Sequence, residues 1–349
     1  MKQIDAGPQA GSAKTTWSAK VAAPGTVARL CIWLGDRPVA SGSLILTVAL
    51  AVPLGLDGYL VYLTNLALVY AVTAMGFTIV LGWTGLLGLC NSAFFGLGAY
   101  TGGLVAARWG VPVEAAILAG ALAGGLVGLA FGSLAVRLRR YYLAITAIAF
   151  MFVLDYFFRN LDEITGGVRG LVIPAPTFAL LGFQQVSSSY GHYYFSLLMV
   201  VVVYLFAVRL RKSSLGREWQ VVRADERVAM ALGINVYLSK LKAFVIGFAV
   251  IAASGAWLGF LLGRIFPESF LGNEMMYQFL IVALGGLGSV NGAVGGAIFL
   301  IVVRQYLRGY VGISEILFGV LLLVTVLALP RGIYGTLAEK YRGLREGFL

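Results

Sequence analysis

Charge is scarce in this sequence. Only 12% of its 349 residues are Asp, Glu, Lys or Arg, whereas 60% are hydrophobic; a soluble domain of average composition has about 25% charged residues. Between Gly58 and Ala107 none of these four residue types occurs. Apolar runs of about 20 residues cross a bilayer as helices, because a helix satisfies its own backbone hydrogen bonds in lipid. The composition therefore excludes an ordinary soluble domain and predicts an all-α integral membrane protein.

Residues that bind metals or form disulfides are also few. The chain has one histidine, His192, and two cysteines, Cys31 and Cys90, and it has no CxxC pair. These numbers exclude a disulfide framework and a His/Cys metal site. A phosphate-binding P-loop and a GxSxG nucleophile elbow are absent as well. We therefore expect a chain that is not an enzyme and binds no metal or cofactor. Any energy for active transport must then come from an ion gradient or a partner.

The net charge of +11 requires that a nucleic-acid partner be considered. The basic residues, however, lie in the two tails and in short segments between apolar runs. That distribution is typical of the cytoplasmic loops of membrane proteins. We therefore expect contact with a lipid bilayer and no contact with nucleic acid.

The apolar runs predict a polytopic helical bundle of about nine to ten transmembrane segments. The expected spans are residues 39–56, 59–81, 93–107, 113–136, 141–158, 193–208, 243–263 and 313–329, with 277–303 as a re-entrant hairpin or two short spans. Residues 39–335 would form this transmembrane domain. Residues 1–38 are expected to form a disordered basic cytoplasmic tail, and residues 336–349 a second cytoplasmic tail.

Lys and Arg set the expected orientation, because they accumulate in cytoplasmic loops. Three arginines fall between Arg137 and Arg140, and eight Lys or Arg residues fall between Arg209 and Lys242. Both segments should therefore be cytoplasmic, with 210–240 as the main cytoplasmic loop. The segment 160–191 should be a periplasmic loop, and both termini should be cytoplasmic.

Two local patterns have structural interpretations. Glycines recur every fourth residue in the span 113–136, which places small residues on one helix face for close packing against another helix. These glycines are Gly120, Gly124, Gly128 and Gly132. Asp155 and Arg159 are four residues apart near the end of a span, and we expect them to form a local ion pair.

Two apolar runs are interrupted by glycine and asparagine: GWTGLLGLCNSAFFGLGAY (Gly82–Tyr100) and GGLGSVNG (Gly285–Gly292). When residues 85–96 are laid over residues 285–296, six of twelve positions are identical. Corresponding broken segments in two halves of a transporter mark its substrate path, although glycine also permits simple close packing. The candidate pathway residues are Gly85, Gly88, Asn91, Ser92, Gly285, Gly288 and Asn291.

In the cytoplasmic segment, residues 217–232 are predicted to form one short helix that Gly233 terminates. A short amphipathic helix between two spans can dock into a groove of another protein. The alternative is a helix that lies flat on the lipid headgroups.

The run ADERVAMALGINVYLSKLKAF, residues 224–244, resembles the ATPase-coupling loop of branched-chain amino-acid ABC transporter permeases of the LivM-like type. The stretches GWTGLLGLCNSAFFGLGAYTGG, ITGGVRGLVIP, PESF with LGGLGSVNGAVGGA, and PRGIYG are similar to the same family, so that the resemblance covers residues 59–335. Family members usually have histidine near the first interruption, where this chain has Asn91 and Ser92. The solute therefore stays open between branched-chain amino acids and urea, short amides, or aromatic and other carboxylates.

The resemblance implies a permease subunit of a bacterial importer in the inner membrane. The implied partners are a homologous second permease, two cytoplasmic ATP-binding subunits that hold ATP and Mg, and a periplasmic binding protein. The implied ATPase-coupling residues are Arg223, Asp225, Glu226, Ala229, Gly233 and Asn235. The near absence of buried charge fits a passage that binds its solute weakly.

Two other classes compete with this interpretation. An ion-coupled carrier or channel needs ionisable groups inside the membrane, and the candidates Glu114, Asp155 and Glu315 lie near the ends of predicted spans. An integral membrane enzyme would need a metal cluster, a nucleophile motif or paired acids within the membrane, and the sequence shows none of them.

Overall fold

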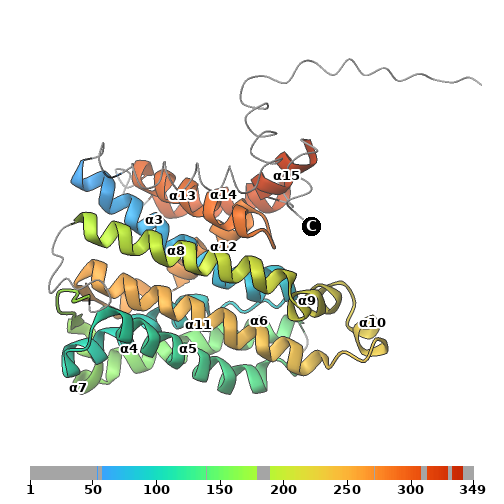
Figure 1. Ribbon diagram of the computed structural model, residues 1–349, viewed down its shortest axis with the longest axis horizontal. Helices are drawn as coiled ribbons and strands as arrows, with labels where there is room; N and C mark the ends of the chain where they lie inside the picture. The colour runs from blue at the N-terminus through green and yellow to red at the C-terminus, as the bar shows by residue number, and fades with distance from the viewer. Residues whose placement is uncertain are drawn as a thin grey trace, which may run out of the picture.

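The computed structural model describes residues 53, 57–138, 140–178, 189–270, 272–307, 313–328 and 332–340 (Figure 1). Its long helices are α3 (Gly58–Phe77), which continues into the π-helical turn η2 (Thr78–Trp83), α4 (Asn91–Trp109), α5 (Val113–Ala135), α6 (Arg140–Asn160), α8 (Ser189–Lys212), α11 (Val236–Leu262), α12 (Gly272–Gly285), α13 (Val290–Leu307) and α14 (Ile313–Ala328). Six helices in these residues are long and apolar enough to cross a membrane: α3 with η2, α5, α6, α8, α11 and α13. The prediction of an all-α, multi-pass membrane protein is confirmed.

Some predicted segments lie outside the described residues. They are the span 39–56, apart from Pro53, and both tails, apart from residues 336–340.

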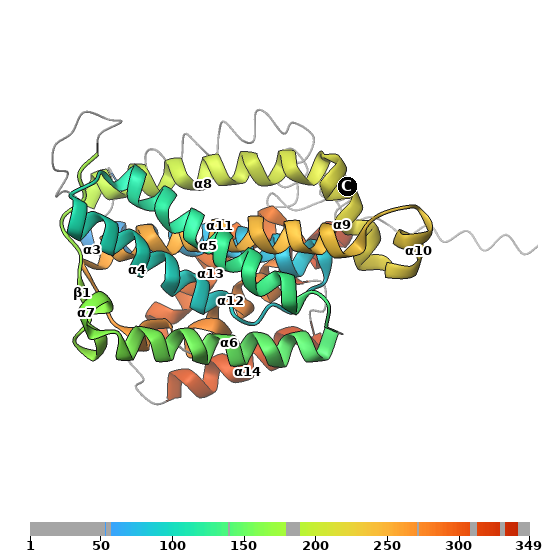
Figure 2. The ribbon, with the colours of Figure 1, turned by 90° about the horizontal axis from the view of Figure 1, so that it is seen from below.

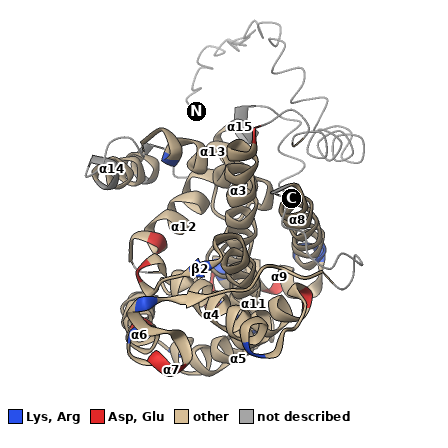
Figure 3. Cartoon of the chain, turned by 90° about the vertical axis from the view of Figure 1, so that its left-hand side faces the viewer, with Lys and Arg blue, Asp and Glu red and all other residues tan. Residues whose placement is uncertain are grey.

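Helix α3 lies in the middle of the bundle and α6 lies at its edge. Of the most apolar 18 residues, 94% are buried in α3, compared with 28% in α6. Figure 3 looks along the helices and shows charged residues as short coloured stretches of an otherwise uncharged ribbon. The exposed apolar faces of α5, α6 and α8 suit contact with lipid, where an apolar surface has no cost.

The predicted glycine stripe on α5 packs against α11, as expected. A Cβ on Gly120 would lie 2.9 Å from Cβ of Ala256, and a Cβ on Gly124 would lie 2.8 Å from the carbonyl oxygen of Phe248. Gly128 and Gly132 face the same helix. The missing side chains therefore let the two helix backbones approach closely.

Both interrupted runs form a helix, a break and a second helix, as predicted. In the first hairpin, α3 and η2 are followed by an irregular stretch at residues 85–90 and then by α4. In the second hairpin, residues 286–289 separate α12 from α13, and these two helices pack against each other. The predicted re-entrant element at 277–303 is thus a pair of helices of 14 and 18 residues.

The molecule has two distinct ends (Figure 2). At one end, β1 (Leu171–Val172) pairs antiparallel with β2 (Arg264–Ile265), next to the short helices α7 (Asp162–Thr165) and η3 (Gly167–Arg169). At the other end lie α9 (Ser214–Ala224) and α10 (Glu226–Ala231). We call these the β1–β2 end and the α9–α10 end. The segment 160–178, part of the predicted periplasmic loop 160–191, therefore contains two short helices and a strand.

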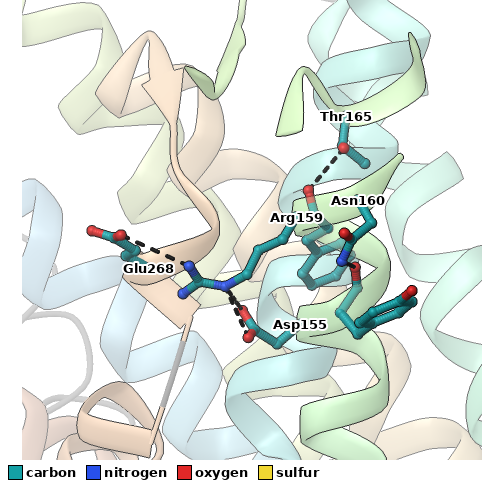
Figure 4. Close-up of polar contacts among 7 residues, drawn as sticks. Asp155, Arg159, Asn160, Thr165 and Glu268 are labelled. Carbon is teal, nitrogen blue, oxygen red and sulfur yellow. Dashed lines mark hydrogen bonds and ion pairs between the residues drawn. The ribbon is translucent and has the colours of Figure 1, made fainter. Parts of the chain in front are cut away.

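The predicted ion pair on α6 is present at the β1–β2 end. Nε of Arg159 lies 3.0 Å from Oδ2 of Asp155, and Nη1 lies 3.8 Å from Oε1 of Glu268 in η4 (Pro267–Phe270) (Figure 4). Glu268 is exposed, so that its share in stability is small. The contact joins the end of α6 to the connection between β2 and α12.

Candidate functional site

The breaks of the two hairpins meet. A Cβ on Gly82, in η2, would lie 2.7 Å from the backbone nitrogen of Gly288, in the second break. The indole Nε1 of Trp83 donates a hydrogen bond of 3.1 Å to the carbonyl oxygen of Gly288. We call Gly82, Trp83 and Gly288 the break junction. Residues 205 positions apart in the sequence are therefore in direct contact.

Gly288 has φ of +99°, a backbone conformation that residues with a side chain rarely adopt. It also lies against Gly82, so that both its conformation and its surroundings require glycine. Gly85, with φ of +71°, follows η2 at the start of the first break. Gly88 lies within that break beside Phe248, and Gly285 ends α12.

The two asparagines at matching positions of the interrupted runs, Asn91 and Asn291, have different surroundings. Asn91 begins α4 and is completely buried, and its Nδ2 donates to Oε1 of Gln278 at 2.7 Å. Asn291 lies on an exposed part of α13, where its Oδ1 accepts a hydrogen bond from the hydroxyl of Tyr204 at 2.7 Å. Ser92 is buried beside Asn91, with its Oγ 3.4 Å from Sδ of Met151. Their place in a substrate path stays a prediction. Of the two asparagines, Asn91 is buried and Asn291 is exposed.

Helix α9 contacts the break junction directly. The buried ring of Trp219 stacks on Trp83, with 6.0 Å between ring centroids and 24° between planes. Nη1 of Arg223 donates a hydrogen bond to the carbonyl oxygen of Gly82. The indole Nε1 of Trp219 donates to the carbonyl oxygen of Ser239 at 2.8 Å, which ties α9 to α11 as well. A displacement of α9 would therefore be felt at both breaks.

The prediction of a single helix over 217–232 is wrong in one respect: the helix is interrupted at Asp225. This residue is extended, with φ of −157° and ψ of 120°, and its Oδ1 accepts a hydrogen bond from the backbone nitrogen of Arg227 at 2.7 Å. Aspartate is a preferred N-cap, because its side chain satisfies a free N–H at a helix start. Asp225 therefore ends α9 and begins α10. Gly233, with φ of +80°, follows the end of α10, as predicted.

The remaining predicted coupling residues hold the α9–α10 segment to α11. Oε1 of Glu226 lies 2.7 Å from Nζ of Lys240, and Ala229 is completely buried. Asn235 is the N-cap of α11, since its Oδ1 accepts a hydrogen bond from the backbone nitrogen of Leu238 at 3.1 Å. Three large apolar side chains of this segment are instead exposed: Val228, Met230 and Leu232.

The expectation of little buried charge is wrong at two places in the described residues. One is Lys240 on α11, which is 6% exposed and pairs with Glu226. The other is Glu274, which falls between the predicted spans 243–263 and 277–303; it lies in the first turn of α12 and is 7% exposed. Its Oε2 lies 4.0 Å from Nη1 of Arg304 on α13, and both residues line a cavity of about 480 Å³. An acid at the start of an apolar run looks like a loop residue, and its partner is 30 positions away in the sequence.

A metal centre is not supported. Within the described part of the chain, no group of three or more His, Cys, Asp or Glu side chains could hold a metal ion.

Known proteins place the chain in a family. Residues 59–329 match the family described as branched-chain amino acid transport system / permease component. The chain is 31% identical over 310 residues to the high-affinity branched-chain amino acid transport system permease protein LivM of Escherichia coli (strain K12), which covers 83% of this chain and 73% of that protein. It is 26% identical over 286 residues to LivH of Salmonella typhimurium, which covers 76% of this chain and 91% of that protein.

A probable LivM permease of Methanocaldococcus jannaschii is 30% identical over 246 residues, which covers 64% of this chain and 68% of that protein. No solved structure shows a significant match. The family match spans all the long described helices from α3 to α14. The chain therefore belongs to the family of branched-chain amino acid transport system permeases and is a membrane-embedded component of an ABC transport system.

Proposed function

We propose that this chain is a permease subunit of an ATP-driven importer for branched-chain amino acids in the bacterial inner membrane. Its partners would be a homologous second permease, two ATPases that hold ATP and Mg, and a periplasmic binding protein. The names of the relatives supply the solute class, and the sequence resemblance supplies the partners. In the orientation expected from the distribution of Lys and Arg, the α9–α10 end would face the cytoplasm and the β1–β2 end would face the periplasm.

One observation carries the mechanism: α9 contacts the point where the two breaks meet. Trp219 stacks on Trp83, and Arg223 binds the carbonyl oxygen of Gly82. Movement of the ATPases on ATP binding would push α9 and α10, and this contact would carry the movement to both hairpins. The hairpins would then switch the solute path through Gly85, Gly88, Asn91, Ser92, Gly285, Gly288 and Asn291 between outward and inward exposure.

Replacement of Arg223 by alanine is expected to reduce leucine uptake about tenfold and to leave ATP hydrolysis by the assembled transporter intact. The variant removes a hydrogen bond from a charged donor to the first break, and such bonds contribute roughly 1.5–3 kcal/mol. Uptake and hydrolysis would be measured on the same proteoliposomes. Arg217→Ala is the matched control, because Arg217 lies on the same helix and binds only local backbone, the carbonyl oxygen of Lys212. Equal uptake by the two variants would contradict the coupling role.

Replacement of Leu232 by aspartate is expected to prevent the ATPases from co-purifying with the permease. Leu232 is 66% exposed and lies with Val228 and Met230 in an exposed apolar group beside the α9–α10 end, which fits a groove on a partner protein. The measurement is the amount of ATPase retained when the permease is isolated from membranes. Leu238→Asp would serve as control, since Leu238 is also exposed but lies on α11. Full retention by Leu232→Asp would exclude this docking surface.

The proposal as a whole is tested by reconstitution. The complete transporter should accumulate leucine, isoleucine or valine against a gradient when ATP and the binding protein are supplied, and the permeases alone should not. Accumulation without the ATPases would overturn the ABC mechanism. Accumulation of urea, amides or aromatic carboxylates in place of the three amino acids would change the solute and keep the mechanism.

A further inference from the structure

A cavity of about 480 Å³ opens between α3, α11, α12, α13 and α14. Its volume lies within the range of about 300–1,000 Å³ found for small-molecule sites. It lies near the β1–β2 end, because it is lined by Tyr62 in the first turns of α3, Leu262 at the end of α11 and Ser269 in η4. The orientation proposed above makes this the periplasmic side, where a solute arrives.

The cavity contains one acidic and one basic side chain, Glu274 and Arg304. Nη1 of Arg304 and Oε2 of Glu274 are 4.0 Å apart, whereas a tight charge-assisted hydrogen bond measures about 2.7–2.9 Å. The two groups thus lie near each other without closing a short contact. Glu274 lies in the first turn of α12 and Arg304 in the last turn of α13, and an ionisable pair between apolar helices is by default a candidate for a solute or ion path.

Neighbouring groups hold the two charges in place. Nε2 of Gln278 donates to Oε1 of Glu274 at 3.2 Å, and Nη1 of Arg304 donates to the hydroxyl of Tyr70 at 3.2 Å. The guanidinium also lies over the ring of Tyr277, 4.6 Å from its centroid. Gln278 in turn accepts a hydrogen bond from Asn91, at the start of α4. A continuous polar chain therefore links the cavity to the first hairpin.

Apart from Ser269 and Gln305, the remaining walls are apolar or aromatic. They include Leu63, Leu66, Leu258, Ile301 and Phe318. The guanidinium can bind a carboxylate of a solute, and the carboxylate of Glu274 can bind an ammonium. Transfer of a branched aliphatic side chain from water to apolar walls is favourable. This combination matches a zwitterionic α-amino acid with an apolar side chain.

We propose that this cavity is a binding site of the permease for its solute on the periplasmic side. Arg304 binds the α-carboxylate, Glu274 binds the α-ammonium, and the apolar walls accept the side chain. The inference rests on the proposed import of amino acids and adds the residues that would select a zwitterion. The polar chain through Gln278 and Asn91 gives the occupied site a connection to the moving hairpin.

The test uses the complete transporter in proteoliposomes with leucine as the solute. The double variant Glu274→Gln with Arg304→Gln removes both charges together, so that neither is left buried without its partner. A purely structural ion pair can be replaced in this way at little cost. We expect the maximal rate of leucine uptake to fall at least tenfold, with ATP hydrolysis unchanged. The double variant Asp155→Asn with Arg159→Gln is the control, because it removes an ion pair at the same end of the molecule that does not line the cavity, and its uptake should be unchanged.

A second measurement does not depend on the variants. Saturation-transfer NMR on the unaltered complex without the binding protein should detect leucine binding, with weaker signals from 4-methylpentanoate, which lacks the ammonium, and from 3-methylbutylamine, which lacks the carboxylate. Equal signals from all three, or no leucine signal, would overturn the proposal even if the double variant fails to assemble. Normal uptake by the double variant would overturn it as well. Failure of the unaltered transporter to accumulate leucine would instead refute the import of amino acids itself, and the cavity assignment with it.

Discussion

Replacement of Gly98 by alanine is expected to destabilise the permease so strongly that most of the folded protein is lost from the membrane fraction. A Cβ at this position would overlap the carbonyl oxygen of Ala252 and lie 2.6 Å from its Cα. These are backbone atoms inside α11, so that no rotation of a side chain can relieve the overlap. The contact is reciprocal, because a Cβ on Gly255 of α11 would overlap the carbonyl oxygen of Phe95 on α4.

The cost should be large because α11 has no room to move away. Gly124 of α5 also packs against Cβ of Ala252, and a Cβ on Gly76 of α3 would lie 2.9 Å from the carbonyl oxygen of Gly247, so that α3, α4 and α5 all hold α11. Insertion of a methyl group into a well-packed interior typically costs about 1–3 kcal/mol, and here whole helices must separate. The yield of monodisperse protein and the melting temperature in detergent measure the effect.

Gly295→Ala is the matched control for this prediction. Gly295 lies on an exposed face of α13, where a Cβ would meet no described atom within 4 Å. Alanine is the better helix former by about 1 kcal/mol, so the control should keep or raise the melting temperature. If Gly98→Ala behaves in the same way, the α4–α11 crossing is looser than the structure shows.

Sequence reasoning predicted those parts of the molecule that depend on local pattern. The expected span 113–136 is α5, Val113–Ala135, because its boundaries follow from where the apolar run ends. The glycine stripe of α5 predicted a packed face, although it could not name α11 as the partner. The two breaks were also predictable, since glycine and asparagine interrupt otherwise apolar runs at the same relative positions.

Features that arise from tertiary contacts were missed. Nothing near Glu274 in the sequence indicates burial, and its neighbours Tyr70 and Arg304 come from other helices. Asn91 and Asn291 occupy matching positions in the two interrupted runs. The fold shows that Asn91 binds Gln278, whereas Asn291 binds Tyr204. The break at Asp225 could have been found, because aspartate followed by a glutamate and a helical run is a typical N-cap pattern.

Replacement of Trp83 by phenylalanine is expected to uncouple transport from ATP hydrolysis. Phenylalanine keeps an aromatic ring to stack on Trp219, but it loses the indole N–H that donates to the carbonyl oxygen of Gly288. Trp83 joins α9 to the second hairpin, because its ring stacks on Trp219 and its indole N–H donates to Gly288. The guanidinium of Arg223 also lies beside Gly288, where it would be 3.1 Å from a Cβ, but it donates its hydrogen bond to Gly82 in the first hairpin. Loss of the Trp83 hydrogen bond should therefore leave α9 attached to η2 while the second break follows its movement less closely. Coupling between sites is typically about 1–3 kcal/mol, or roughly 5–150-fold, so we expect leucine uptake to fall by at least fivefold while stimulated ATP hydrolysis persists.

Trp109→Phe controls for a general effect of losing an indole, since Trp109 is 74% exposed and lies at the end of α4 opposite to the first break. Its uptake should equal that of the unaltered transporter. A loss of both uptake and hydrolysis in Trp83→Phe would mean that the residue supports assembly rather than coupling, and unchanged uptake would mean that the two hairpins move independently. A selective loss of uptake is the outcome that requires the hydrogen bond to Gly288, because the variant retains an aromatic ring at the same buried position to stack on Trp219, and persistent hydrolysis shows that the smaller ring still permits assembly.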